Sequence, residues 1–303
     1  MPGATRGPLP WDARFPGRHR ALAALFGDLE PLPRAWPDPR ALNALLARGG
    51  GTAVTAGGVP VRAVPGIALG GGDWERRLAT TGEIPVRQGS WHDLFNLLAW
   101  RAFPRTKAAV NGAHLEALVH EAEGRRGPRR DALAAFDEDG LVVACEDDDL
   151  EALVRDFRWR ELFVDHRDAA CARLHALVFG HALCEKLLAP FKGITGKALF
   201  VAVPPGFGRL PPSEQRALAD RIAAPQVAGL ISPQALAPLP VLGLPGWWPG
   251  NEDPAFYDDP AVFRPGRRVR GADQGAGAGP PVHSPVMSAS SFRRAVPAIP
   301  SIP

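Results

Sequence analysis

The chain has 303 residues, which is enough for one or two domains with a large buried core. Its 35 Lys and Arg residues nearly balance 32 Asp and Glu residues, so the net charge of +3 is too small to indicate an acidic partner. The cysteines Cys145, Cys171 and Cys184 are odd in number and lack ligand-like spacing, so we expect reduced thiols rather than disulfides or a zinc knuckle.

We expect neither a signal peptide nor a membrane span. The N-terminal stretch MPGATRGPLPWDARFPGRHR contains no apolar segment of the kind found in signal peptides. No run approaches the ~18 uninterrupted apolar residues of a transmembrane helix. We therefore predict a cytoplasmic protein that has no membrane partner.

The N-terminal region combines a loose arm with two short helices. Residues 1–16 are rich in Pro, Gly and Arg, and we expect an arm that packs through Trp11 and Phe15. Apolar residues at helical spacing predict helices over 20–29 and 39–48.

The next segment is expected to be mainly extended. Alternating apolar residues predict a short strand over 59–64, and the glycines at 70–72 predict a flexible turn. Pro85 disfavours a helix around it, so we also expect 74–87 to be extended.

The second half of the chain mixes predicted helices and strands. Two short apolar runs, 133–136 and 141–144, flank the acidic turn 137–140, and this pattern predicts a β-hairpin. Further along we expect helices over 147–157, 171–188 and 212–224, and a strand over 197–203.

These patterns predict an α+β fold, namely a helix-rich single domain with a small, mainly antiparallel sheet. The Pro-rich segment 238–265 carries aromatic residues and is expected to form a strap over the core. We expect the globular domain to cover 17–265, after the arm of residues 1–16. The Pro-, Gly-, Ala- and Ser-rich tail, 266–303, is expected to be disordered.

The segment 90–120 predicts two helices that are broken at Pro104. His92 and Asn96 share one face of the first helix, and Asp93 lies beside Asn96. Because this helix is otherwise apolar and buried, its polar groups must be paired or used. Asp93 also fits a capping box with the preceding serine, and His92 is equally well explained as a core histidine.

The second helix of this pair carries further polar residues. Lys107, Asn111 and His114 are spaced i, i+4 and i+7, so they share a face. Lys107 and Asn111 are therefore candidates for substrate binding. The alternatives are a solvated lysine and an asparagine that holds a turn or a carbonyl.

A later helix supplies a candidate metal pair. His181 and Glu185 are four residues apart, a spacing that suits two ligands of one metal or a histidine oriented by a carboxylate. Together with His92 and Asp93 they would suit zinc, iron or manganese. Pairs of this kind are also common on ordinary helices.

The loop KGITGK places Lys192 and Lys197 beside two glycines. It is not a P-loop, because Phe191 replaces the first glycine and Ala198 replaces the hydroxyl residue. The lysines and backbone N–H groups are candidates for binding an anion, and the alternative is a helix stop with a tight turn.

The loop GRRGPRR, 124–130, carries four arginines that could contact phosphate. No aromatic residues are interleaved for base stacking, so we do not expect nucleic-acid binding. A solvated surface loop is the simpler interpretation.

Four stretches of the chain resemble an uncharacterised bacterial family that is classed as a domain of unknown function. They are WHDLFNLLAW…FPRTKAAVN, RRDALAAFDEDG, FGHALCEKLLAPFKGITGKAL and PLPVLGLPGWWPGNEDPAFYDDPAVFRP. Together they span roughly 74–265, which is most of the folded chain. The resemblance implies a single bacterial domain and points to the same histidines, acids and lysines, but it supplies no activity.

The leading hypothesis is an enzyme, a metal-dependent hydrolase that acts on a small anionic ligand bearing phosphate or carboxylate. The candidate catalytic and metal-binding residues are His92, Asp93, His181 and Glu185, with a divalent metal ion as cofactor. The candidate substrate-binding residues are Asn96, Lys107, Asn111, Lys192 and Lys197. The alternatives are a non-catalytic binding or scaffolding protein and, less favoured, an RNA-associated protein.

Overall fold

The computed structural model describes residues 9–48, 52–66, 71–120 and 126–266. These residues belong to one compact unit that ends at Gly266. Apart from residue 266, the predicted disordered tail lies outside the described residues, and so do residues 1–8 of the predicted arm. The boundaries predicted for the globular domain stay predictions.

The larger sheet is four-stranded and mixed. Its strands lie in the order β4 (Leu174–Val178), β3 (Gly140–Cys145), β5 (Thr195–Ala202) and β6 (Ala237–Pro240). β3 is antiparallel to β4 and parallel to β5, and β5 is antiparallel to β6. Every residue of β3 is buried, as is typical of a central strand covered on both faces. The predicted α+β class with a small, mainly antiparallel sheet is confirmed.

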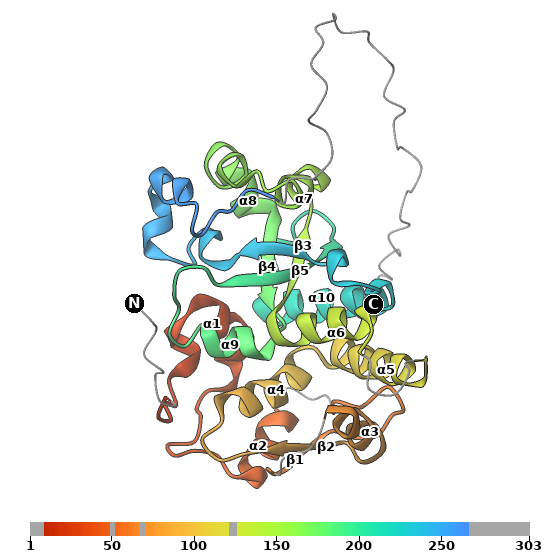
Figure 1. The fold of residues 1–303 in the computed structure, drawn as a ribbon. Helices are drawn as coiled ribbons and strands as arrows, with labels where there is room; N and C mark the ends of the chain where they lie inside the picture. The colour runs from red at the N-terminus through yellow and green to blue at the C-terminus, as the bar shows by residue number, and fades with distance from the viewer. Residues whose placement is uncertain (1–8, 49–51, 67–70, 121–125, 267–303) are drawn as a thin grey trace, which may run out of the picture. The chain divides into compact units, whose positions relative to one another are not determined.

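Helices cover this sheet and its two ends (Figure 1). They are α1 (Arg20–Phe26), α6 (Pro128–Asp139), α7 (Asp148–Arg155), α8 (Arg167–Arg173), α9 (His181–Lys186) and α10 (Pro212–Gln226). α1 packs against β4, while α6 and α10 pack against β5. α6 and α9 lie together at the lower end of the sheet in Figure 1.

A second, smaller layer lies below the sheet in Figure 1. It contains the parallel pair β1 (Arg62–Pro65) and β2 (Glu83–Val86), with α2 (Pro39–Ala47) and α3 (Gly71–Thr81). α4 (Trp91–Ala102) and α5 (Pro104–His120) follow, separated at Phe103. α4 packs on both β2 and α9, so it joins the small layer to the end of the main sheet.

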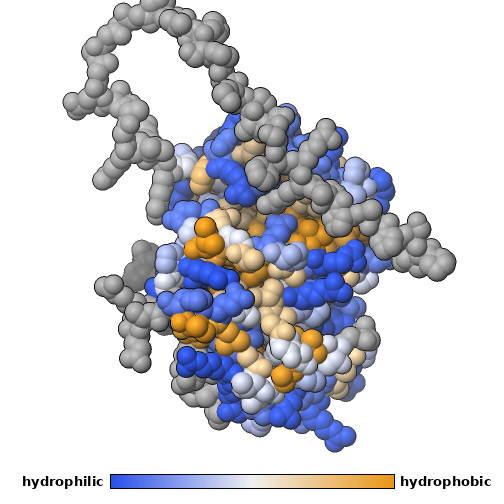
Figure 2. All heavy atoms as spheres, turned by 90° about the vertical axis from the view of Figure 1, so that its right-hand side faces the viewer, coloured by the Kyte–Doolittle hydropathy of each residue, from blue (hydrophilic) through white to orange (hydrophobic). Residues whose placement is uncertain are grey.

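The hydrophobic core is one continuous cluster that extends from Phe15 to Phe263. Trp11, in the described part of the arm, stacks on Trp91 at the start of α4 with ring centroids 5.3 Å apart. The exposed large hydrophobic residues among those described are Val54, Val119, Phe191 and Ile231. Hydrophilic and hydrophobic residues intermix on the face shown in Figure 2, as is usual for protein surfaces.

The segment 74–87 was expected to be extended, and this prediction is wrong for its first half. Residues 71–81 form α3, and only 83–86 form a strand. Proline restricts itself and the residue before it, so Pro85 leaves the earlier turns free to be helical. Leu78 is buried, and Gly82 ends the helix with a φ of +67°.

The predicted hairpin over 133–144 is also wrong. Residues 128–139 form α6, and β3 begins at the next residue. Pro128 suits the first turn of a helix, and the apolar residues Leu133 and Phe136 are buried at helical spacing. The acidic residues at the end of α6 are followed by Gly140, and this pattern resembles a turn because Asp and Gly are common in turns.

The long helix predicted over 171–188 is wrong as well. The chain forms α8, then β4, then α9, and β4 pairs along its whole length with β3. A short apolar run does not distinguish a strand from a buried helix, and here the sheet pairing decides. The strand places Gly180 and His181 directly after its end.

The remaining predicted elements correspond to observed ones within a few residues. They are the helices over 20–29, 39–48, 147–157 and 212–224, the central pair, and the strands over 59–64 and 197–203. The strap over 238–265 consists of the end of β6 followed by short 3-10 turns. In the part of the chain that the structure describes, no helix combines the length and apolarity needed to cross a membrane.

Candidate metal centre and its cavity

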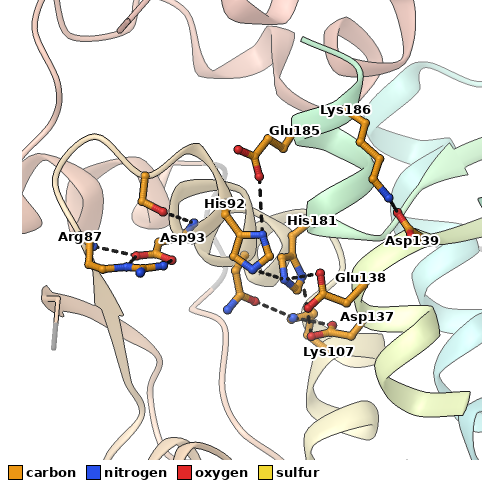
Figure 3. A network of polar contacts seen from close by, with 12 residues as sticks. Arg87, His92, Asp93, Lys107, Asp137, Glu138, Asp139, His181, Glu185 and Lys186 are labelled. Carbon is orange, nitrogen blue, oxygen red and sulfur yellow. Dashed lines mark hydrogen bonds and ion pairs between the residues drawn. The ribbon is translucent and has the colours of Figure 1, made fainter. Parts of the chain in front are cut away.

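Two histidines meet where α4 packs on α9 (Figure 3). His92 lies in the first turn of α4, and His181 is the first residue of α9. Their Nε2 atoms are 3.1 Å apart, and the rings are inclined at 76°. Two residues that are 89 positions apart in the sequence therefore direct the same ring nitrogen to one point.

The start of α4 fixes the position of His92. The Ser90 hydroxyl accepts a hydrogen bond from the Asp93 N–H at 3.2 Å, so the helix begins at Trp91. The Trp91 ring is buried against the aromatic cluster that contains Phe95. Successive helical residues point about 100° apart, so anchoring Trp91 in the core turns His92 away from it.

A close backbone contact fixes the position of His181. Gly180 donates from its N–H to the Gly140 carbonyl at 2.9 Å. A Cβ on Gly180 would lie only 2.4 Å from the Glu138 carbonyl oxygen, so a side chain does not fit here. This glycine lets the turn between β4 and α9 lie directly on the turn between α6 and β3.

That contact brings a carboxylate to the two histidines. Glu138 Oε2 lies 3.5 Å from His181 Nε2. One ligand atom each from His92, Glu138 and His181 lie within 4.8 Å of one another, so these residues could hold a metal ion. The hydrogen bond from His181 lowers the pKa of Glu138 below its usual value, which keeps this carboxylate ionised.

The other ring nitrogens of both histidines face carboxylates. His92 Nδ1 lies 3.6 Å from Glu185 Oε2, and His181 Nδ1 lies 3.8 Å from Asp137 Oδ2. Histidines that bind metals are commonly oriented in this way by a carboxylate behind the ring.

Asp137 is itself held by a buried lysine. Lys107 is 4% exposed, and its Nζ donates to Asp137 Oδ1 at 2.6 Å and to Asn96 Oδ1 at 2.8 Å. Burial raises the pKa of Asp137, but Lys107 and His181 outweigh this effect and hold it below its usual value. Lys107 therefore holds in place the Asp137 carboxylate that faces His181.

A cavity of about 440 Å³ opens beside the three candidate ligands, and all three contribute to its wall. The same wall includes Glu75 and His114. Glu75 accepts a hydrogen bond from Asn111 at 2.6 Å, and burial raises its pKa to about 7. Burial lowers the pKa of His114 to about 4, so this ring is neutral at pH 7.

The structure separates the four residues predicted to be metal ligands. His92 and His181 lie together, and Glu185 lies behind His92 rather than beside the Nε2 atoms. Asp93 is turned to Arg87, which donates three hydrogen bonds to its carboxylate, one from the backbone N–H. Burial raises the pKa of Asp93, but Arg87 more than offsets this, so the pKa lies below its usual value.

The predicted substrate-binding residues are also divided. Asn96 lines the cavity and is bonded to Lys107, whereas Asn111 holds Glu75. Lys192 is exposed and forms an ion pair with Asp259, while Lys197 lies on β5. Both lysines are described in the structure, and neither is part of the cavity wall.

The sequence pattern does not single out Asp137, Glu138 or Glu75. It predicts a hairpin turn for the two acids in α6, whereas the observed helix places them near its carboxyl end. Glu75 lies in the segment that was expected to be extended. Its hydrogen bond with Asn111, which lies 36 residues further along the chain, joins α3 to α5. No local sequence pattern indicates such a contact.

Comparison with known proteins gives a family but no function. No curated protein and no solved structure matches the chain significantly. The family described as a protein of unknown function, DUF3025, matches residues 64–267, a range that contains every residue of the centre and its cavity. The expected membership of a domain of unknown function is confirmed: the chain belongs to the DUF3025 family.

Proposed function

We propose that the protein is a metal-dependent hydrolase whose metal is bound by His92, Glu138 and His181. The observation that carries this proposal is the convergence of the two Nε2 atoms, 3.1 Å apart, with Glu138 Oε2 3.5 Å from one of them. Two ligands of a tetrahedral zinc ion at about 2.0–2.1 Å lie roughly 3.3 Å apart. The spacing of these atoms is compatible with that geometry.

The number of ligands supports a catalytic rather than a purely structural metal. Structural zinc is usually enclosed by four protein ligands, whereas catalytic zinc has three and keeps a position for water. Two histidines and one carboxylate form such a three-ligand set, and all three line the cavity. A metal held there would lower the pKa of bound water and polarise a substrate oxygen.

The cavity supports a small anionic substrate. Its volume of about 440 Å³ is near the lower end of the range for small-molecule sites. Arg126 and Arg130 contribute to its wall beside the candidate ligands. A guanidinium group and a metal ion together suit a phosphate or a carboxylate group. Hydrolysis of an ester or anhydride bond next to that group is the reaction we assign.

The first test is metal content. The full chain is dialysed against a mixture of Zn²⁺, Mn²⁺ and Fe²⁺, and bound metal is measured by mass spectrometry. We expect one ion per chain, with at least tenfold weaker binding in His92→Ala, His181→Ala and Glu138→Gln. His166→Ala is the matched control, because His166 is half-exposed and does not line the cavity.

The second test is turnover. The metal-loaded chain is assayed with p-nitrophenyl phosphate and p-nitrophenyl acetate, which report hydrolysis of phosphate and carboxylate esters. Turnover that requires the metal supports the proposal. A parent chain that folds normally and binds no metal would overturn it and would favour the non-catalytic binding role.

A further inference from the structure

We propose that Glu75 is the group that exchanges a proton with whatever is bound in this cavity, and that Asn111 positions it. This inference rests on the proposed hydrolase for its chemical step. It assigns the general acid–base role to α3, outside the three candidate metal ligands. Glu75 suits this role because its surroundings differ from those of the other carboxylates of the cavity.

The wall of the cavity contains four carboxylates, and three of them have a cationic or histidine partner. Asp93 is bonded to Arg87, Asp137 is paired with Lys107, and Glu138 lies against His181. In each case the partner stabilises the ionised form, so the pKa lies below its usual value. These groups stay charged and are poorly suited to accept a proton near neutral pH.

Glu75 is the fourth carboxylate, and its partner is neutral. Its Oε2 accepts from the Asn111 side chain at 2.6 Å, and its backbone carbonyl accepts from the same amide at 3.3 Å. Among the described residues, no other hydrogen bond to the Glu75 carboxylate is found. An amide orients a carboxylate without adding the positive charge that would hold it ionised.

The charges around Glu75 do not reverse this difference. Burial is the largest influence on the pKa of Glu75; the hydrogen bond from Asn111 lowers the pKa, nearby Asp137 raises it, and the result is about 7. Lys107 and Arg130 act in the opposite direction, but Lys107 is already paired with Asp137. His114, which also lines the cavity, is neutral at pH 7. Glu75 is therefore half protonated near neutral pH, as a general acid–base group requires.

Unsatisfied polar atoms next to Glu75 also point to a ligand. Asn111 is 3% exposed, and its Oδ1 has no hydrogen-bond partner among the described residues. His114 is 6% exposed, and the same is true of its Nδ1. Buried polar atoms are rarely left without partners. His114 lines the cavity, so a substrate with a hydrogen-bonding group there would give its Nδ1 a partner.

The chemical step balances with Glu75 as the only proton carrier. Its carboxylate takes a proton from water while the water oxygen forms a bond to the electrophilic phosphorus or carbon. The bond to the leaving group then breaks with its electron pair. The Glu75 carboxyl returns the proton to the leaving-group oxygen, so no oxidant or other reactant is needed.

The experiment measures the protonation of Glu75 directly. The full chain is labelled with ¹³C at the glutamate side-chain carboxyl carbons and titrated by NMR, together with Glu75→Gln. We expect one signal with a midpoint near pH 7 that is absent from the variant. Glu116→Gln is the matched control, because Glu116 is exposed and lies outside the cavity wall. A Glu75 midpoint below about pH 5 would overturn the proposal, whether or not metal binds.

The same variants are then compared in metal content and turnover. We expect Glu75→Gln to keep the metal of the parent, to lose about 10²–10⁴-fold in kcat, and to lose the pH dependence centred near 7. Unchanged kcat and pH profile would show that Glu75 transfers no proton in the reaction and would overturn its acid–base role. A parent without metal or turnover would instead remove the proposed hydrolase, and the NMR midpoint would still decide whether Glu75 holds an exchangeable proton.

Discussion

Among the described residues, two cavities of the same volume, about 440 Å³ each, differ in how their charged residues are used. The cavity between α1, α8 and the strap contains Arg167, which is bonded to Tyr257 and Glu252. Its His175 lies 3.2 Å from the Ala172 carbonyl oxygen. These polar groups hold the strap and the end of α8 in place.

The cavity beside His92 and His181 has the opposite character. Its histidine Nε2 atoms converge on each other, and the Nδ1 atom of His114 lacks a hydrogen-bond partner among the described residues. A cavity alone therefore says little about function. The informative difference is whether its polar groups satisfy one another or leave atoms free for a ligand. The following predictions test that difference, in order of decreasing effect.

The largest effect is expected for Lys107→Met. The change leaves the partly buried Asp137 carboxylate without its cation, which typically costs about 3–5 kcal/mol of the free energy of unfolding. Arg167→Met in the other cavity is the comparison, because its carboxylate partner Glu252 is exposed and can be solvated by water when the cation is removed. Urea unfolding of both variants checks this, and equal losses would contradict the predicted difference between the cavities.

Glu75→Gln should change how stability depends on pH. The folded pKa of about 7 lies above the usual value of 4.5, so the folded state holds the proton more tightly. The free energy of unfolding of the parent should therefore fall by up to about 3 kcal/mol as pH rises from about 4.5 to 7. The variant should lack this loss, and identical unfolding curves across this pH range would contradict the prediction.

Gly180→Ala should disturb the centre through the backbone. The added methyl group would lie 2.4 Å from the Glu138 carbonyl oxygen, so the two turns must separate, at a cost of about 1–3 kcal/mol. We also expect weaker metal binding, because Glu138 and His181 move apart. Gly229→Ala is the control, since a methyl group added there would meet nothing within 4 Å. Calorimetric metal titration of both variants measures the difference.

The smallest effect on the centre is expected for Asp93→Asn. The variant loses its ion pair with Arg87. Hydrogen bonds to a charged group contribute about 1.5–3 kcal/mol to the free energy of unfolding, and the solvent exposure of Arg87 reduces this contribution. Metal stoichiometry should stay that of the parent, because Asp93 faces Arg87 and not the Nε2 atoms. Loss of metal from a folded Asp93→Asn chain would return Asp93 to the ligand set.

The sequence supports the general fold better than the ligand set. Apolar spacing identifies α4 and α5, and the Pro104 break follows from the chemistry of proline. His92 and His181 are recognisable as site candidates because burying a polar side chain on an apolar segment is costly unless it is paired or functional. Their distance is not predictable in this way, because it depends on how α4 packs against α9.

The missing carboxylates have a different cause. Glu138 lies at the carboxyl end of α6, where negative charge is unfavourable for a helix. An acidic run at this place looks like a turn in the sequence. Glu185, at the helical spacing of i+4 from His181, is the more obvious candidate in sequence. In three dimensions the α6–β3 junction brings the Glu138 carboxylate to His181, because residues 174–178 pair with β3 as a strand and do not continue the helical pattern of 171–188.

The antiparallel register of β3 and β4 determines how far apart Glu138 and His181 lie. Leu141 pairs with Val178, and Glu138 in α6 and His181 in α9 each lie three residues beyond this pair, at the same end of the two strands. A slip of one residue would displace the two groups by about 3.3 Å, many times the tolerance of ~0.2 Å in a metal–ligand distance. A single insertion or deletion in either strand should therefore abolish the centre while the sheet remains able to form. Length changes in loops away from these strands should leave it intact.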